Sequence, residues 1–154
     1  MLPGGDGVAR RGGHGLVSGD QLSLREAVTG ELAAATSRLP QAEQTALARR
    51  ERERRSHAQI ADELELDGEA EAALLLAEAR LRLRAELRGT PPEDAGACTE
   101  RERALILLAR RQDGEDLAPD QEDWIRQHMA GCAPCERAHA AMFEASVCYR
   151  AGTP

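Results

Sequence analysis

The chain has 154 residues and a formal net charge of −7. This length suits one ordinary domain or two very small ones, and the acidic balance disfavours broad binding to nucleic-acid phosphates, which takes an excess of basic side chains. Aromatic residues make up only 2%, and the 42% hydrophobic content comes mainly from Ala and Leu, both strong helix formers. We therefore expect an all-α protein whose thin core would benefit from a stabilising metal ion.

No stretch of the sequence has the character of a membrane span, a signal peptide or a catalytic motif. The longest apolar runs, at residues 72–77 and 104–109, are far shorter than the ~18 residues of a spanning helix, and the N-terminus lacks an apolar signal core. We expect a cytoplasmic protein whose four cysteines serve metal or redox chemistry rather than structural disulfides. Because no nucleophile motif or phosphate-binding Gly loop is found, an enzyme is not expected.

The N-terminal third predicts a tail followed by two helices. Residues 1–20 are rich in Gly and carry no apolar period, so we expect a disordered tail. Ser23 and Glu26 have the spacing of a capping box, which predicts the start of a helix. Leu39-Pro40 predicts the start of a second helix, since proline suits the first helical turn. The expected apolar face of the first helix comprises Leu24, Ala27, Val28, Leu32 and Ala35.

The second predicted helix runs into the sequence ARRERERR at residues 48–55. One interpretation is a solvated face with ion pairs of mixed sign; the other is a surface that contacts DNA phosphates. The DNA-binding interpretation rests on Arg49, Arg50, Arg52, Arg54 and Arg55.

Two further helices complete the first half of the chain. Ser56 and Gln59 form another capping-box pattern, which predicts a third helix. Asp67-Gly68 predicts a turn, and residues 69–87 a fourth helix that ends at the Gly- and Pro-containing stretch after Arg88.

The second half predicts three more helices. Thr99 and Glu102 form a third capping-box pattern, so a helix should begin just after Cys98 and end near Gln112. Later helices are expected from about residue 120 to 128 or 129, and from about 134 to 149. The sequence thus predicts two small helical modules, residues 21–88 and 97–150, joined by a linker at 89–96.

The second predicted module contains the pattern His-x-x-x-Cys-x-x-Cys, formed by His128, Cys132 and Cys135. Zn²⁺ prefers four thiolate or imidazole ligands in a tetrahedron. A CxxC pair at a turn directs two thiolates to one ion, and a histidine near the end of the preceding helix can reach the same ion. The pattern therefore predicts three ligands of a metal site.

The first module resembles the region-four DNA-binding domain of bacterial sigma factors, especially the extracytoplasmic-function group. The resemblance covers about residues 36–88 and implies a helix-turn-helix. Two departures stand out: His57 replaces the usual aromatic residue, and Glu65 replaces the usual Gly at the turn. Besides Leu39-Pro40, the matching residues are Ser56, Ile60, Ala61, Leu64, Leu66, Ala79, Arg80 and Leu83.

The helix expected to read DNA has the wrong chemistry for that task. It contains GEAEAALLLAEA at residues 68–79, in which the carboxylates repel phosphates and no side chain can read guanine bidentately. The resemblance implies the fold, whereas the chemistry disfavours strong promoter recognition. Three consecutive leucines at 74–76 also exceed one buried stripe, so they pack on a partner, on the second module or in a tighter core.

The second module resembles the zinc finger of anti-sigma factors over about residues 97–146. That family runs from a Cys or His through an apolar helix, Asp-Gly-Glu-Leu-Ser-Pro-Glu-Glu and a helix to His-Leu-x-x-Cys-x-x-Cys. The resemblance implies a fourth ligand at the start of the first helix, which selects Cys98, about three residues upstream of the common spacing; Cys148 and His139 are the alternatives. The matching residues are Asp113, Gly114, Glu115, Leu117, Pro119, His128, Cys132 and Cys135.

Three functions follow from these features. The first is a transcription regulator that contacts a sigma factor or an RNA polymerase subunit through a structural Zn²⁺ module. The second is a sigma-like DNA-binding regulator, which lacks room for the promoter-melting region two. Thiol oxidation with loss of zinc is a further hypothesis for control of this chain. The third is a purely structural zinc module. The connecting stretch of about ten residues from Arg88 to Ala97 also allows the second module to mask the first.

Overall fold

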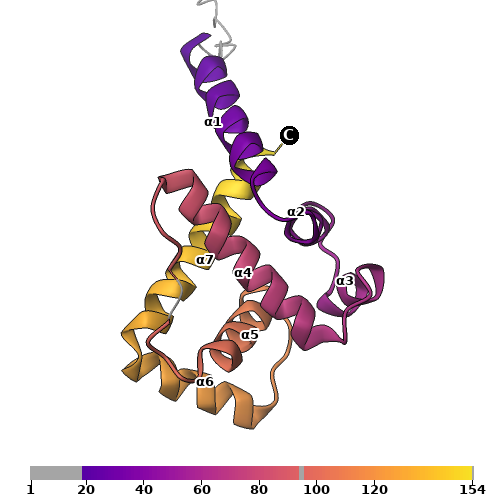
Figure 1. The fold of residues 1–154 in the computed structure, drawn as a ribbon, viewed down its shortest axis with the longest axis vertical. Coiled ribbons are helices and arrows are strands. Elements are labelled where there is room, and N and C mark those ends of the chain that lie inside the picture. Colours follow the sequence, from indigo (N-terminus) through magenta and orange to yellow (C-terminus); the bar gives the residue numbers. More distant parts are fainter. Residues whose placement is uncertain (1–18, 94–95, 154) are drawn as a thin grey trace, which may run out of the picture.

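A computed structural model of the protein describes residues 19–93 and 96–153. Within these residues the fold is all-α, as the sequence predicts, and no strand occurs. Most of the Gly-rich tail, residues 1–18, lies outside the described part. The helices, labelled in Figure 1, are α1 (Gly19–Ser37), α2 (Gln41–Leu47), the π-helical turn η1 (Ala48–Arg52), α3 (His57–Glu63), α4 (Glu69–Arg88), α5 (Arg101–Gln112), α6 (Pro119–Gly131) and α7 (Ala133–Gly152).

Helix α4 crosses the middle of the molecule and contacts helices from both halves of the sequence (Figure 1). It packs against α1, α2 and α3, which precede it, and against α5 and α7, which follow it. Residues 72–77 of α4 are all Ala or Leu, and a helical stretch that is apolar all round is stable only when it is buried on several sides. Leu74 packs toward the second half, while Leu75 and Leu76 pack among residues of α2 and α3. The extra leucines therefore pack within the chain.

Two of the predicted capping boxes are wrong, and one is confirmed. Ser23 lies inside α1, which begins at Gly19. Helix α5 begins at Arg101 with Glu100 as its N-cap and no side-chain cap, so Thr99 does not start it. Ser56 does cap α3: its Oγ accepts the Gln59 amide, and the Gln59 side chain accepts the Ser56 amide. Of the three predicted boxes, the Ser56–Gln59 pair is the one that lies at the start of a helix, where the first backbone amides lack partners within the helix.

The apolar face predicted for α1 is buried only in its second half. Leu32 and Ala35 lie in a hydrophobic cluster with residues of α4 and α7. Leu24 and Val28 remain 66% and 41% exposed, because the N-terminal part of α1 extends away from the other helices (Figure 1).

The turn between α3 and α4 has the hydrogen bonds of a Schellman motif, in which the amides after a helix return to its last carbonyls. The Leu66 amide donates to the Ala61 carbonyl at 2.8 Å, and the Glu65 amide donates to the Asp62 carbonyl at 3.4 Å. Glu65 adopts a left-handed φ of +56°, which favours glycine. The sequence departure at Glu65 is therefore a strained residue at a position that suits Gly.

The two halves of the sequence, residues 19–93 and 96–153, share hydrophobic clusters. Ala73, Ala77 and Leu81 of α4 lie in the same hydrophobic cluster as residues of α5, α6 and α7. The predicted boundaries at 21–88, 89–96 and 97–150 stay predictions, but the halves are packed against each other. No helix in the described part is both long enough and apolar enough to span a membrane.

Candidate metal centre

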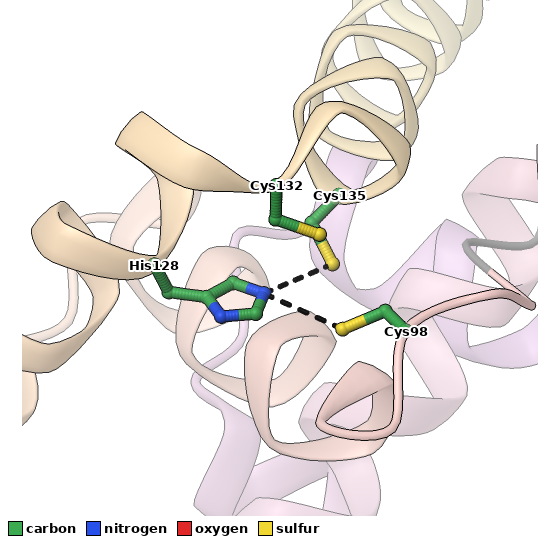
Figure 2. Close-up of side chains that lie close together, drawn as sticks. All are labelled: Cys98, His128, Cys132 and Cys135. Carbon is green, nitrogen blue, oxygen red and sulfur yellow. Dashed lines mark hydrogen bonds between the residues drawn. The ribbon is translucent and has the colours of Figure 1, made fainter.

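Four side chains from three parts of the second half converge at one point (Figure 2). They are the four residues that the sequence analysis selected as metal ligands: Cys98, His128, Cys132 and Cys135. Their ligand atoms all lie within 4.8 Å of one another. The Nε2 atom of His128 lies 3.5 Å from Sγ of Cys98 and 3.4 Å from Sγ of Cys135. The cluster is close enough to hold one metal ion.

The local chain path explains how the four ligands meet. Cys98 lies in the turn before α5, where its carbonyl accepts the Arg101 amide at 3.3 Å. His128 lies in the last turn of α6. Cys132 has an extended conformation, ends α6 and begins α7, so the chain reverses at this residue. Cys135 follows in the first turn of α7 and is fully buried.

The turn between α5 and α6 holds the first two ligands, Cys98 and His128, in position. Gly114 has a left-handed φ of +76°, which lets the chain leave α5 directly after Asp113. Pro119 then occupies the first turn of α6, and the Gln121 side chain accepts the Ala118 amide at 3.0 Å. The Asp-Gly and Ala-Pro pairs thus form a helical hairpin whose open end carries Cys98 and His128.

Stacked aromatic rings orient the histidine. The rings of Trp124 and His128, one turn apart on α6, are nearly parallel with centroids 4.8 Å apart. The guanidinium of Arg103 lies 4.0 Å from the centroid of the Trp124 ring. Residues that fix the plane of a ligating imidazole strengthen metal binding, so Trp124 acts as a support for the ligand set that the sequence motif does not include.

The two cysteines of the CxxC pair have different electrostatic environments without an ion. A backbone hydrogen bond from Cys135, at the N-terminus of α7, lowers the pKa of Cys132 despite partial desolvation. Burial raises the pKa of Cys135 to about 12, and hydrogen bonds with the neighbouring thiols add to this effect. Cys135 therefore needs a cation nearby before its thiolate becomes stable, as expected for a metal ligand in an apolar wall.

The alternative ligands are not part of the cluster. Cys148 lies on α7 beside a hollow between α1 and α4, together with Val28 and Leu87. His139 is half-buried on α7, and burial together with the nearby Arg111 charge lowers its pKa. Among the described residues, the geometry selects Cys98 over both.

Most of the arginines predicted as possible DNA contacts have partners inside the chain. Arg49 binds Glu63 and Glu53, and Arg55 also binds Glu53. Arg50 donates to the Asp113 carbonyl at 3.0 Å, which leaves its side chain only 14% exposed. Arg52 lies 5.8 Å from the centroid of the Tyr149 ring, and Arg54 is exposed with a left-handed φ of +54°. The mixed-sign face is thus present, with one exception in its middle.

That exception is Glu51, which is buried with Arg80 in an ionic cluster that joins the two halves. The π-helical turn η1 carries the Glu51 carboxylate into the core, where it accepts hydrogen bonds from Arg80, Ser146 and Arg150. Arg80 has no exposed surface and also donates to both Asp113 oxygens, at 2.6 and 3.1 Å. We call Arg50, Glu51, His57, Arg80, Asp113, Glu115, Ser146 and Arg150 the Arg80 cluster.

The turn that follows α5 forms the second-half side of this cluster. His57 is fully buried, with Nε2 2.7 Å from Asp113 and Nδ1 3.3 Å from Glu115. Glu115 also accepts the His57 backbone amide at 2.9 Å and so covers the start of α3. Burial raises the pKa of Asp113, but the His57 hydrogen bond and the charges of Arg80 and Arg50 lower it to about 2. The carboxylate is therefore firmly ionised.

Sequence reasoning missed the Arg80 cluster, although two signals were present. His57 occupies a position where the sigma-factor resemblance implies an aromatic side chain, and Arg80 belongs to the residues that carry that resemblance. Both signals indicate a buried polar side chain, but neither indicates that its partner is Asp113 in the second half of the sequence. The family profiles, the curated proteins and the solved structures with which the chain was compared gave no match.

Proposed function

We propose that the protein is a bacterial transcription regulator that binds a sigma factor or an RNA polymerase subunit through a zinc-stabilised helical unit. The observation that carries this proposal is the closed set of four ligands, which connects the start of α5, the end of α6 and the start of α7. The resemblance of this segment to the anti-sigma zinc finger supplies the class of partner.

Zinc is the metal we assign to the cluster. For a tetrahedral ion with a metal–sulfur distance of about 2.3 Å and a metal–nitrogen distance of about 2.05 Å, nitrogen and sulfur should lie about 3.6 Å apart. The two distances from His128 Nε2 to sulfur, 3.5 and 3.4 Å, are close to this value. Three thiolates and one imidazole suit Zn²⁺, and four protein ligands leave no position for a substrate water. The zinc would therefore be structural.

The outer face of α7 offers a surface for a protein partner. Phe143 and Val147 lie one turn apart and are 59% and 50% exposed. Met142 and Tyr149, on the same helix, are buried and so belong to the core. Exposed aromatic side chains are common anchors in protein interfaces, so Phe143 is the contact residue that we expect to matter most.

Affinity capture from the organism's own reduced, nuclease-treated lysate tests the proposal. Recovery of a sigma factor without core polymerase supports an anti-sigma role. Cys135→Ser should abolish both zinc binding and capture, whereas Cys148→Ser, a matched change on the same helix, should preserve both. Recovery of the same proteins by the Cys135→Ser chain would contradict the role of the metal unit.

The second candidate is a sigma-like regulator that binds DNA through α3 and α4. The capped α3, the Schellman turn and the long α4 favour it because they have the order of a helix-turn-helix. The exposed start of α4 carries Glu69 and Glu71, which would repel phosphates. Capture of core polymerase without another sigma factor would favour this candidate, and so would DNA affinity that falls steeply with salt.

A further inference from the structure

Two anchor points lie at opposite ends of α5. Cys98, a ligand of the metal centre, precedes the helix, and Asp113, a member of the Arg80 cluster, ends it. The helix has 12 residues, which corresponds to about 18 Å at 1.5 Å per residue. The start of α5 is thus held by the metal centre, and its end is held by the ion pairs of the Arg80 cluster.

The Arg80 cluster connects residues that belong to different halves of the sequence. Asp113 from the second half contacts Arg80, His57 and Arg50 from the first. Glu51 from the first half accepts hydrogen bonds from Ser146 and Arg150 of α7. The cluster therefore breaks if α5 and α7 move away from α4.

The cysteines of the metal centre belong to, or pack against, a hydrophobic cluster that also contains residues of α4. Cys135 is buried in one hydrophobic cluster with Ala73, Ala77 and Leu81 of α4, and Cys98 and Cys132 pack against that cluster. Alanines make up much of this contact, including Ala104, Ala109, Ala138 and Ala141 on the opposite side. Alanine buries little apolar area per residue, so each contact contributes little to stability. The contact between α4 and the helices α5 and α7 therefore depends on these helices being held in place by other interactions.

We infer that metal binding controls the docking of α5, α6 and α7 on α4, and that the Arg80 cluster transmits this control. With the ion bound, the open end of the α5–α6 hairpin is closed and Asp113 is held against Arg80. Without it, the hairpin loosens and the face of α4 that carries Ala73, Ala77 and Leu81 becomes accessible. The inference rests on the proposed function only in that the cluster binds a metal ion.

Coupling of this kind is reciprocal: if the metal stabilises the docked state, then a change that lowers the population of the docked state must also lower the affinity for the metal. Two independent measurements follow. One removes the metal and observes α4; the other alters the Arg80 cluster and observes the metal.

The first measurement is amide hydrogen exchange of the unaltered full chain, loaded with Zn²⁺ and after chelation. We expect exchange at residues 72–83 of α4 to become at least about tenfold faster after chelation, within the typical 5- to 150-fold range of coupling between sites. Faster exchange confined to the ligand segments, residues 97–101 and 127–137, overturns the inference.

The second measurement is the Zn²⁺ affinity of Asp113→Asn, determined by competition with a chelator. We expect a loss of about tenfold or more, although Asp113 contacts no metal ligand. Asp123→Asn is the matched control, because this carboxylate is exposed on α6 and pairs with Arg126 at the surface. Equal affinity of Asp113→Asn and Asp123→Asn overturns the inference.

Glu115→Gln provides a milder change if Asp113→Asn does not fold, because Glu115 lies at the edge of the cluster with 20% of its side chain exposed. A threefold or greater loss of affinity supports the inference, and no loss overturns it. Failure of the unaltered chain to bind Zn²⁺ removes the metal unit of the proposed function as well. Tight binding of Zn²⁺ without any change in amide exchange of α4 would overturn the inferred coupling and leave the proposed metal unit intact.

Discussion

Replacing Glu65 with glycine should stabilise the protein. Glu65 is exposed and holds a φ of +56° at the end of the Schellman motif after α3. An L-residue with a side chain pays about 1–2 kcal/mol in this conformation. Glycine avoids that cost but loses about 0.5–1 kcal/mol more conformational entropy on folding. The net gain from Glu65→Gly should be about 0.5–1 kcal/mol.

Urea unfolding of the zinc-loaded chain measures this gain directly, and the thermal midpoint should rise by about 1–4 °C for a domain of this size. Arg54→Gly should change stability in the same direction, since Arg54 also has a left-handed φ, of +54°. Ala140→Gly is the control: Ala140 is exposed in the interior of α7, where glycine should cost about 1 kcal/mol. A loss for Glu65→Gly similar to that for Ala140→Gly would refute the assignment of strain to this turn.

Three further results are expected. Arg80→Met should lower the free energy of unfolding by about 3–5 kcal/mol, because it leaves buried carboxylates without their main partner. Arg38→Met, which removes an exposed ion pair, should change the free energy of unfolding by less than about 1 kcal/mol. Equal effects of the two substitutions in urea unfolding would contradict the burial of the Arg80 cluster. Acid should destabilise the protein through Asp113, because the pKa of this carboxyl is about 2 when folded and 3.8 ordinarily. The ionised carboxylate contributes its full stabilisation above about pH 4, and about 2 kcal/mol of stability is lost as the pH falls through 2; urea unfolding at each pH should show that Asp113→Asn lacks this part of the loss. Trp124→Ala should weaken Zn²⁺ binding by about 10- to 100-fold in chelator competition, because the stacked ring orients His128; unchanged affinity would exclude that support.

The features that the sequence predicted correctly are those controlled by neighbouring residues. Ser56 and Gln59 are three residues apart and form a box that depends only on local geometry. Cys132 and Cys135 lie at one turn between helices, so their thiols meet wherever that turn forms. Cys98 came instead from the family resemblance, and its distance of 30 residues from His128 made it the least determined ligand.

The features that the sequence did not predict depend on distant partners. Glu51 stands in a run of alternating charges that is typical of a solvated face, and nothing near it indicates that Ser146 and Arg150 will surround its carboxylate. The predictions of capping boxes at Ser23 and Thr99 were wrong because neither residue lies where a helix starts. A capping residue stabilises a helix only where the chain leaves the helix axis, and at these two positions the chain already follows a helix or a preceding turn.

The sequence separation within the Arg80 cluster has a consequence for synthesis on the ribosome. Glu51 lies 95 residues before Ser146 and 99 before Arg150. At about 5–20 residues per second, the 70 residues between Arg80 and Arg150 take about 4–14 s to emerge. During that time the surface awaiting α5 and α7 presents the charges of Arg80 and Glu51 as well as alanine methyl groups. Hydrated charges at an unfinished surface oppose the hydrophobic association that makes incomplete folds aggregate. We therefore expect the charged centre of this core to oppose association of the incomplete chain until α5 and α7 cover it.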